Sequence, residues 1–151
     1  MILTPMEIAL LEARLAAKKD EVPVGAVIMY NKKIIARAGN CTKAVYDPTG
    51  HAEIRVIRMA CELFQNERLP DCDLYVTLEP CAMCAAAISF TRIRRLYYAT
   101  GDIKGGAIEH GPRLYKQSTC HHKPDIYSGL KQTEASRLLK DFFAKKRNVK
   151  K

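Results

Sequence analysis

The sequence predicts an α/β fold in which a mixed sheet of about five strands is covered by helices on both faces. Two observations support this prediction: two neighbouring β-branched segments near the N-terminus, and then an alternation of helical and strand-like segments. A third observation sets the size, because 151 residues, 48% of them hydrophobic, form one ordinary domain around one core. We therefore expect a single domain over residues 1–151.

The first predicted elements are a helix and a hairpin. Residues 4–7 read Thr-Pro-Met-Glu, a capping box with proline at the first helical position, so a helix is predicted over about 5–19. Residues 22–30 and 34–38 are rich in β-branched side chains and are separated by Asn-Lys-Lys, which predicts a hairpin. A second helix is then expected from near His51 to about Phe64.

The C-terminal half alternates short strands with helices. The predicted elements, in order, are a strand at 74–78, a helix at 81–89, a strand at 96–99, a strand near Ile126 and a helix at about 133–146. Residues 100–124 are rich in Gly, Pro and His and are expected to be mostly loop, with one helical turn near Leu114.

The charge of the chain favours a polyanionic partner. Lys plus Arg number 25 against 16 Asp plus Glu, a net charge of +9. Nucleic acid is the first partner class that such a field favours and an anionic membrane the second, although a merely basic surface explains the charge equally well. The excess gathers at the C-terminus, where residues 140–151 hold six basic residues against one acid. The region from about 133 to 151 is therefore predicted to be a basic helix and arm, with a solvated helix end as the alternative.

No stretch of the sequence predicts a membrane span. The longest nearly apolar stretch, residues 81–90, has ten residues, whereas a helix needs about 20 to cross a bilayer. The N-terminus lacks the basic residues of a secretion signal, so we expect a cytoplasmic protein. For its six cysteines we accordingly expect metal ligation or burial rather than disulfides.

Metal-ligating side chains stand in two short motifs. Cys81 and Cys84 are three residues apart at a predicted helix start, so their sulfurs project from one face, where the field of the helix N-terminus favours thiolates. His51 begins another predicted helix and can supply an imidazole nitrogen. Three protein ligands leave the fourth position of a zinc ion to water, as in catalytic sites, and Glu53 is close enough in sequence to accept a proton there.

Each motif also has an ordinary explanation. A histidine at a helix start is commonly a cap, a lone C-x-x-C is found in redox pairs, and a glutamate in a first turn compensates the helix dipole. A structural zinc would need a fourth ligand, for which Cys120, His121 and His122 are the candidates, in a distant loop. The combination of the motifs favours a catalytic zinc.

H-x-E followed by P-C-x-x-C is the zinc deaminase signature, and over nearly its whole length the sequence closely resembles the bacterial tRNA-specific adenosine deaminases. The stretches that carry this resemblance are residues 21–27, Asn40, 47–49, 51–54, 74–81, 92–93, Asp102, 104–107 and 141–143. Two departures are Gly50, where the family commonly has Ala, and Ala144, where it often has Arg. The smaller Gly50 is expected to loosen the wall of the pocket.

The resemblance implies a three-layer α/β/α cytidine-deaminase-like fold, a homodimer and one zinc ion per chain. The implied reaction is the hydrolytic conversion of the wobble adenosine of a tRNA anticodon to inosine. His51, Cys81 and Cys84 are the implied zinc ligands. Glu53 is expected to take a proton from the attacking water and to deliver protons to ring N1 and to the leaving amine.

Substrate contacts are expected from several segments. Asn40 is implied to hold the nucleoside, and Val27 and Pro80 are candidates for the wall around the base, although core packing and a turn explain these two equally well. Asp102, beside Lys104, is expected to face the RNA backbone and accept a hydrogen bond from a ribose 2′-OH, or else to cap its own turn. The expected contacts in the tail are Phe142, Phe143, Lys145, Lys146 and Arg147, with core packing an equal explanation for one of the two phenylalanines.

Two other functions remain open at this stage. One is a deaminase of free bases or nucleosides, such as guanine or cytosine, that uses the same zinc site. The other is a zinc-bearing RNA-binding module without catalysis, and Glu53 argues against it because binding alone needs no carboxylate beside the metal.

Overall fold

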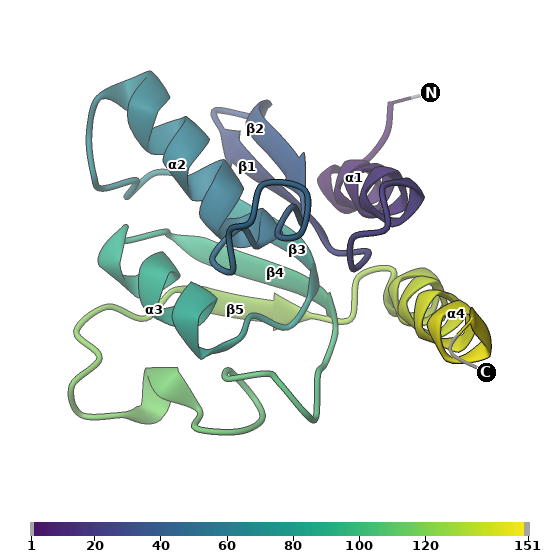
Figure 1. Cartoon of the computed structure of the whole chain (residues 1–151). Helices are drawn as coiled ribbons and strands as arrows, with labels where there is room; N and C mark the ends of the chain where they lie inside the picture. Colours follow the sequence, from purple (N-terminus) through teal and green to yellow (C-terminus); the bar gives the residue numbers. More distant parts are fainter. Residues whose placement is uncertain (1, 150–151) are drawn as a thin grey trace.

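The computed structural model describes residues 2–149 and shows a five-stranded sheet between two pairs of helices (Figure 1). Its strands are β1 (Gly25–Tyr30), β2 (Lys33–Gly39), β3 (Asp73–Leu78), β4 (Arg95–Thr100) and β5 (Asp125–Ser128). The strand order is β2-β1-β3-β4-β5, with β1 antiparallel to both its neighbours and β3, β4 and β5 mutually parallel. The predicted mixed α/β sheet is confirmed.

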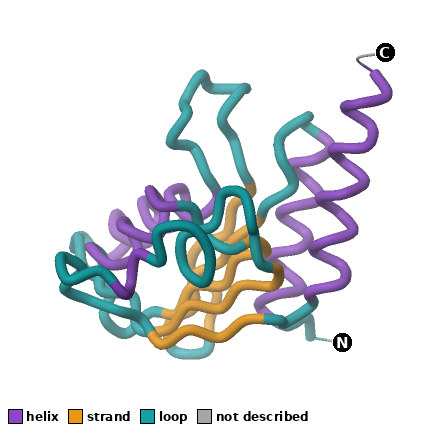
Figure 2. Tube along the Cα trace, turned by 90° about the horizontal axis from the view of Figure 1, so that it is seen from below, coloured by secondary structure: helices purple, strands orange, loops and turns teal. Residues whose placement is uncertain are grey.

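The helices form two layers, one on each face of the sheet (Figure 2). α1 (Pro5–Lys18) and α4 (Gln132–Val149) lie side by side on one face, and α2 (Ala52–Phe64) and α3 (Ala82–Phe90) lie on the other. A single 3-10 turn, η1 (Leu114–Lys116), occupies the place where one helical turn was expected. Within residues 2–149, none of these helices combines the length and apolarity that a membrane span requires.

The starts of α1 and β1 and the turn between β1 and β2 can be explained by local backbone chemistry. Thr4 Oγ1 accepts a hydrogen bond from the Glu7 backbone at 3.2 Å, and Glu7 Oε1 accepts one from the Thr4 backbone at 3.1 Å, so the predicted capping box is confirmed. β1 begins at Gly25 rather than at the predicted Val22. The hairpin turn puts Asn31 and Lys32 at positive φ, the backbone that two-residue hairpin turns require.

The core has two parts, one on each face of the sheet. The larger part lies under α2 and α3 and includes Ile28, Val56, Leu74, Ile88 and Leu96. The smaller part lies under α1 and α4 and includes Met6, Leu10, Val27, Ala99 and Ala135. Alternate residues of β1, Val27 and Ile28, point to opposite parts, as the two-residue period of a strand requires.

Three tyrosines stack across neighbouring strands. Tyr75 of β3 pairs in register with Tyr97 of β4, which pairs with Tyr127 of β5. The first two rings are parallel, with centroids 4.2 Å apart, and the second pair is stacked at 4.9 Å. Tyr75 and Tyr97 pack against the core under α1 and α4. We call this set the tyrosine ladder.

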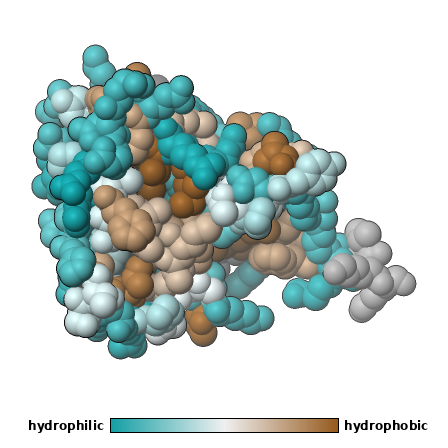
Figure 3. Space-filling view, turned by 60° about the vertical axis from the view of Figure 1, so that its left-hand side comes forward, coloured by the Kyte–Doolittle hydropathy of each residue, from teal (hydrophilic) through white to brown (hydrophobic). Residues whose placement is uncertain are grey.

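The outer surface of α2 and α3 carries exposed apolar side chains. Met59, Leu63 and Phe64 are exposed on α2, and Phe90 at the end of α3 is 75% exposed. Figure 3 views the molecule from the side that brings these helices forward and shows apolar atoms interrupting a hydrophilic surface. The opposite helix pair also exposes apolar side chains, Leu11 and Leu15 on α1 and Phe143 on α4, but α4 adds five basic residues: Arg137, Lys140, Lys145, Lys146 and Arg147.

Candidate active site

Two helix N-termini bring together the side chains that the sequence singled out as metal ligands. His51 is the N-cap of α2, Cys81 is the N-cap of α3, and Cys84 lies buried in the first turn of α3. His51 Nδ1 lies 3.6 Å from Cys81 Sγ and 3.4 Å from Cys84 Sγ. All three donor atoms lie within 4.8 Å of one another, so the cluster could hold a metal ion. We call it the ligand cluster.

The two helices begin one residue later than the sequence predicted. Both start at an alanine, and the preceding His51 and Cys81 have extended backbone. Pro80 therefore precedes the N-cap and does not occupy the first helical position. It is buried, and its carbonyl oxygen accepts a hydrogen bond from the Ala107 backbone at 2.9 Å.

The three ligand side chains influence one another's protonation. A hydrogen bond from Cys84 lowers the pKa of Cys81 to about 4, even though burial opposes the shift. The same side-chain hydrogen bond between the two cysteines, together with burial, raises the pKa of Cys84. The interaction with Cys81 raises the pKa of His51, since an imidazolium is stabilised beside a thiolate. A cation bound at this cluster would displace these protons, because thiolates and a neutral imidazole are its ligands.

Glu53 lies in the first turn of α2 and is only 4% exposed. Burial raises its pKa to about 7, and the neighbouring Cys81 acts in the same direction. A carboxyl group with such a pKa both takes up and gives up a proton near neutral pH, as a general acid–base group must.

Asn40 lies near the start of α2 because a backbone hydrogen bond holds the residue after it against the residue before His51. It follows β2, and the next residue, Cys41, donates a backbone hydrogen bond to the Gly50 carbonyl at 2.8 Å. A Cβ atom added to Gly50 would lie 2.1 Å from the Cys41 carbonyl oxygen. The space beside Gly50 is therefore filled by backbone, and the expectation that this glycine loosens the pocket wall is corrected.

Val27 was a candidate for the wall around the base, and the structure assigns it to the core. Its side chain is fully buried in the part of the core under α1 and α4. The ligand cluster belongs to α2 and α3 on the other face of the sheet, so packing alone accounts for Val27.

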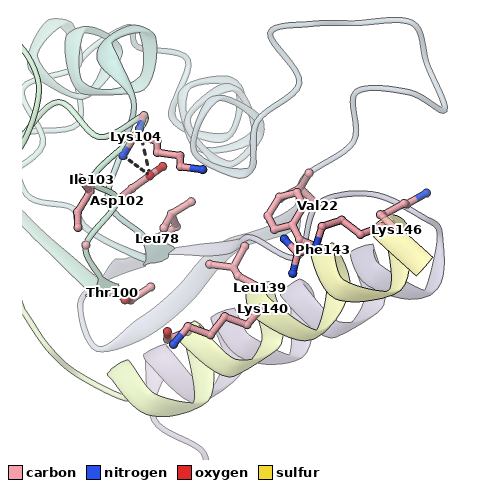
Figure 4. A pocket seen from close by; sticks show the side chains of 14 residues that line it. Val22, Leu78, Thr100, Asp102, Ile103, Lys104, Leu139, Lys140, Phe143 and Lys146 are labelled. Carbon is pink, nitrogen blue, oxygen red and sulfur yellow. Dashed lines mark hydrogen bonds between the residues drawn. The ribbon is translucent and has the colours of Figure 1, made fainter. Parts of the chain in front are cut away.

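A pocket of about 910 Å³ opens between α4 and the loop after β4 (Figure 4). Its apolar surface is formed by Val22, Leu78, Ile103, Leu139 and Phe143. Its cations come from Lys104 in the loop and from Lys140, Lys146 and Arg147 in α4. We call this pocket the basic pocket. It lies at the carboxyl ends of β3 and β4, the sheet edge at which α/β proteins commonly bind ligands.

Five of the predicted RNA contacts line the basic pocket: Asp102, Lys104, Phe143, Lys146 and Arg147. Phe142 instead packs edge-on against Phe143, with the Lys146 ammonium 5.6 Å from its ring. Lys145 is exposed on α4 outside the pocket lining. Lys146 also forms an ion pair with Asp20, which follows α1 and ties the end of α4 to it.

Asp102 caps its own turn at the edge of the basic pocket. Its Oδ1 accepts hydrogen bonds from the backbone of Lys104 at 3.2 Å and of Gly105 at 3.0 Å (Figure 4). The turn-capping alternative is therefore present in the structure, and the same side chain still lines the pocket.

Sequence reasoning did not single out two buried carboxylates that hold loops near the site. Glu21 accepts hydrogen bonds from the backbone of Thr42, Lys43 and Ala44 at 3.0–3.2 Å, and Glu79 binds the loop after β4. Burial alone would raise the pKa of Glu21, but these hydrogen bonds outweigh it and hold that pKa below its usual value. For Glu79 the available signal was an acidic residue inside an otherwise apolar segment, which is costly unless it is paired.

The sequence matches the MafB19-like deaminase family over residues 3–147. It is 61% identical to a tRNA-specific adenosine deaminase of Agrobacterium fabrum over 142 residues, which cover 94% of this chain and 93% of the relative.

Two solved structures extend the comparison to three dimensions. One comes from a study of A-to-I editing by tRNA:A34 deaminases at the wobble position of transfer RNA. It is 61% identical, superposes with a TM-score of 0.88, and covers 89% of this chain and 98% of its own. The other, a guanine deaminase from Nitrosomonas europaea, has a TM-score of 0.79 at 20% identity, covers 95% and 87% of the two chains, and shows a shared fold.

Proposed function

The chain belongs to the MafB19-like deaminase family and, within it, to the tRNA-specific adenosine deaminases, and we propose that it converts the wobble adenosine of a tRNA anticodon to inosine. The observation that carries this proposal is the ligand cluster with a buried carboxylate beside it. That set contains the ligands and the proton carrier that the deaminase reaction requires.

His51, Cys81 and Cys84 would hold one zinc ion per chain. Zinc bonds of about 2.3 Å to sulfur and 2.0 Å to nitrogen, in tetrahedral geometry, separate a sulfur from a nitrogen ligand by about 3.5 Å. The two sulfur–nitrogen distances of 3.6 and 3.4 Å support this assignment. Only three protein ligands surround the position within the described residues, as in catalytic zinc sites.

Zinc in this position supplies a Lewis acid that makes a water molecule acidic enough to lose a proton near neutral pH. Glu53 accepts that proton and delivers it to ring N1 as the water oxygen bonds to C6; it then takes the second proton of the former water from the new C6 hydroxyl and gives it to the leaving amine. The C6–N bond breaks and ammonia leaves, so the overall reaction is a hydrolysis. Burial suits Glu53 to both proton transfers.

The basic pocket supports an RNA substrate. Four cations around an apolar surface suit a phosphate chain with an unstacked base, and Phe143 is exposed for stacking. Asn40 would hold the nucleoside, and Pro80 would border the base. The alternative, a guanine or cytosine deaminase, uses the same metal ligands, but a small neutral base has no need of four cations.

The exposed apolar side chains of α2 and α3 support a homodimer through that face. Leu63→Asp should therefore yield a monomer in analytical ultracentrifugation, and a dimer unaffected by this change would place the contact elsewhere. A tRNA substrate and six free thiols both favour the cytoplasm.

The experiment compares ammonia release from four substrates at equal concentration: an anticodon stem-loop with adenosine at the wobble position, free adenosine, guanine and cytosine. We expect release from the stem-loop at least about 100-fold above the other three, and inosine at the wobble position of the product. Faster release from guanine or cytosine would establish the alternative function and overturn the proposal.

A further inference from the structure

Glu79 is a fully buried carboxylate that neither the ligand cluster nor the proposed proton transfers use. It lies at the carboxyl end of β3, between Leu78 of the basic pocket and the segment Pro80–Cys81. Its side chain has no exposed surface. A buried carboxylate is costly unless several hydrogen-bond donors surround it, so the donors around Glu79 indicate its role.

All of its side-chain donors come from the loop after β4. Oε1 accepts hydrogen bonds from the Asp102 backbone at 3.0 Å and from His110 Nδ1 at 2.6 Å. Oε2 accepts from three consecutive backbone N–H groups, those of Ile108, Glu109 and His110, at 2.9–3.1 Å. The Glu79 carboxylate therefore forms hydrogen bonds with both ends of the segment 102–110.

The loop packs so closely around the Glu79 carboxylate that Gly106 has no room for a side chain. A Cβ atom added to Gly106 would lie 2.5 Å from Glu79 Oε2 and 2.5 Å from the Asp102 carbonyl oxygen. Backbone hydrogen bonds continue the attachment, from Glu79 to the Thr100 carbonyl at 2.8 Å and from Ala107 to the Pro80 carbonyl at 2.9 Å. The loop is thus joined to the two residues that immediately precede Cys81.

We propose that Glu79 is a positioning residue that holds the Asp102–Lys104 turn at a set distance from Cys81, and so aligns the RNA strand in the basic pocket with the reacting base. This inference rests on the proposed function. Glu79 connects the two regions directly. Its carboxylate binds the loop after β4, and its backbone leads within two residues to Cys81 of the ligand cluster. Touching neither substrate nor metal, Glu79 acts through the loop.

Asp73, at the opposite end of β3, is the matched control. It too is buried, and its carboxylate accepts two hydrogen bonds from Arg94 at 3.0 Å. Its partners lie at the amino ends of the strands, away from the loop that Glu79 holds. Loss of either carboxylate removes a buried charge from the same strand, so a difference between the two variants reports on the loop.

The test uses Glu79→Gln and Asp73→Asn in the zinc-loaded protein. The amide that replaces the Glu79 carboxylate must present an NH2 group to N–H donors that had faced an oxygen, so the loop loosens. In Glu79→Gln we expect the loop amides of Asp102 and residues 108–110 to exchange hydrogen at least about 10-fold faster. We expect KM for the anticodon stem-loop to rise about 10-fold, while kcat changes less than about 3-fold and bound zinc stays at one per chain.

Asp73→Asn should lower the melting temperature and leave KM unchanged. His110→Ala, which removes one donor and keeps the backbone contacts, should raise KM about 3-fold, and it tests the same idea if Glu79→Gln does not fold. Unchanged exchange in the loop, or a loss confined to kcat, would overturn the role of Glu79. A wild-type protein inactive on the stem-loop would instead overturn the proposed function, and the exchange measurement, which needs no substrate, keeps the two failures apart.

Discussion

The ligand cluster and the basic pocket both lie beyond the carboxyl end of β3, the first beside α2 and α3 and the second beside α4, but they are built in opposite ways. In the cluster, the backbone of two helix starts places one buried and two partly buried side chains, and the three donor atoms lie within 4.8 Å of one another. In the basic pocket, long and mostly exposed side chains from α4 and from the loop after β4 surround an open volume of about 910 Å³.

The difference indicates how each region tolerates change. Removing a ligand from the cluster leaves an incomplete coordination set, so one substitution abolishes the chemistry. In the proposed function, the basic pocket attracts RNA through several cations that act almost additively, so one substitution should weaken binding only in part. Chemistry is therefore concentrated in a few atoms, and recognition is distributed over many.

The largest expected effect comes from breaking the cluster. Cys84→Ser replaces a buried thiolate by a hydroxyl that ligates zinc poorly, so bound zinc should fall from about one per chain to less than about 0.1, and deamination should fall more than about 10³-fold. Metal analysis and ammonia release measure the two. Cys61→Ser, a cysteine of α2 outside the cluster, should retain both metal and activity. Full zinc in Cys84→Ser would remove Cys84 from the site.

The next effect separates ligation from proton transfer within the same region. Glu53→Ala should retain zinc and RNA affinity but lose at least about 10²-fold in kcat, because general acid–base catalysis contributes that much. Glu62→Ala, an exposed glutamate of the same helix, serves as the control and should leave kcat unchanged. If Glu53→Ala also loses its zinc, the carboxylate supports the metal rather than the proton.

A smaller effect is expected in the basic pocket. The double variant Lys104→Gln and Arg147→Gln should weaken stem-loop binding about 10-fold at moderate salt and reduce the slope of log K against log salt by roughly 1.4, the value for two lost phosphate contacts on single-stranded RNA. Lys32→Gln with Lys33→Gln removes the same charge from the exposed β1–β2 turn and controls for net charge. Equal slopes in the two double variants would show that the pocket does not bind phosphate.

The smallest effect is expected at Asp102, where a turn cap and a substrate contact coincide. Asp102→Asn retains an oxygen for the Lys104 and Gly105 backbones but loses the charge. It should reduce the preference for an RNA over a DNA anticodon loop by a few-fold, roughly 1 kcal/mol, while RNA turnover falls less. Turnover on both loops and the melting temperature provide the comparison. An equal loss on both substrates with a lower melting temperature would leave Asp102 as a turn residue alone.

Sequence was informative wherever a short-range pattern determines the outcome. The capping box at Thr4 and the pair Cys81 and Cys84 were predictable because helix starts and three-residue spacings are local properties, whereas His51, 30 residues before Cys81, was predicted from the combination of the motifs. Two roles stayed open for Val27 because alternate residues of one strand reach opposite faces, and only the packing of α1 decides between them. Glu79 was missed because its partners lie 23 to 31 residues away, and no local pattern records such a contact.

The tyrosine ladder gives this molecule an optical property. The chain has seven tyrosines and no tryptophan, so tyrosine dominates its near-ultraviolet absorption. Rings held at 4.2 and 4.9 Å from one another have fixed, asymmetric surroundings, and tyrosines fixed in this way give near-ultraviolet circular dichroism that mobile rings lack. Because Tyr75 and Tyr97 pack against the core beneath α1 and α4, that signal reports whether those helices are docked on the sheet, without any attached label.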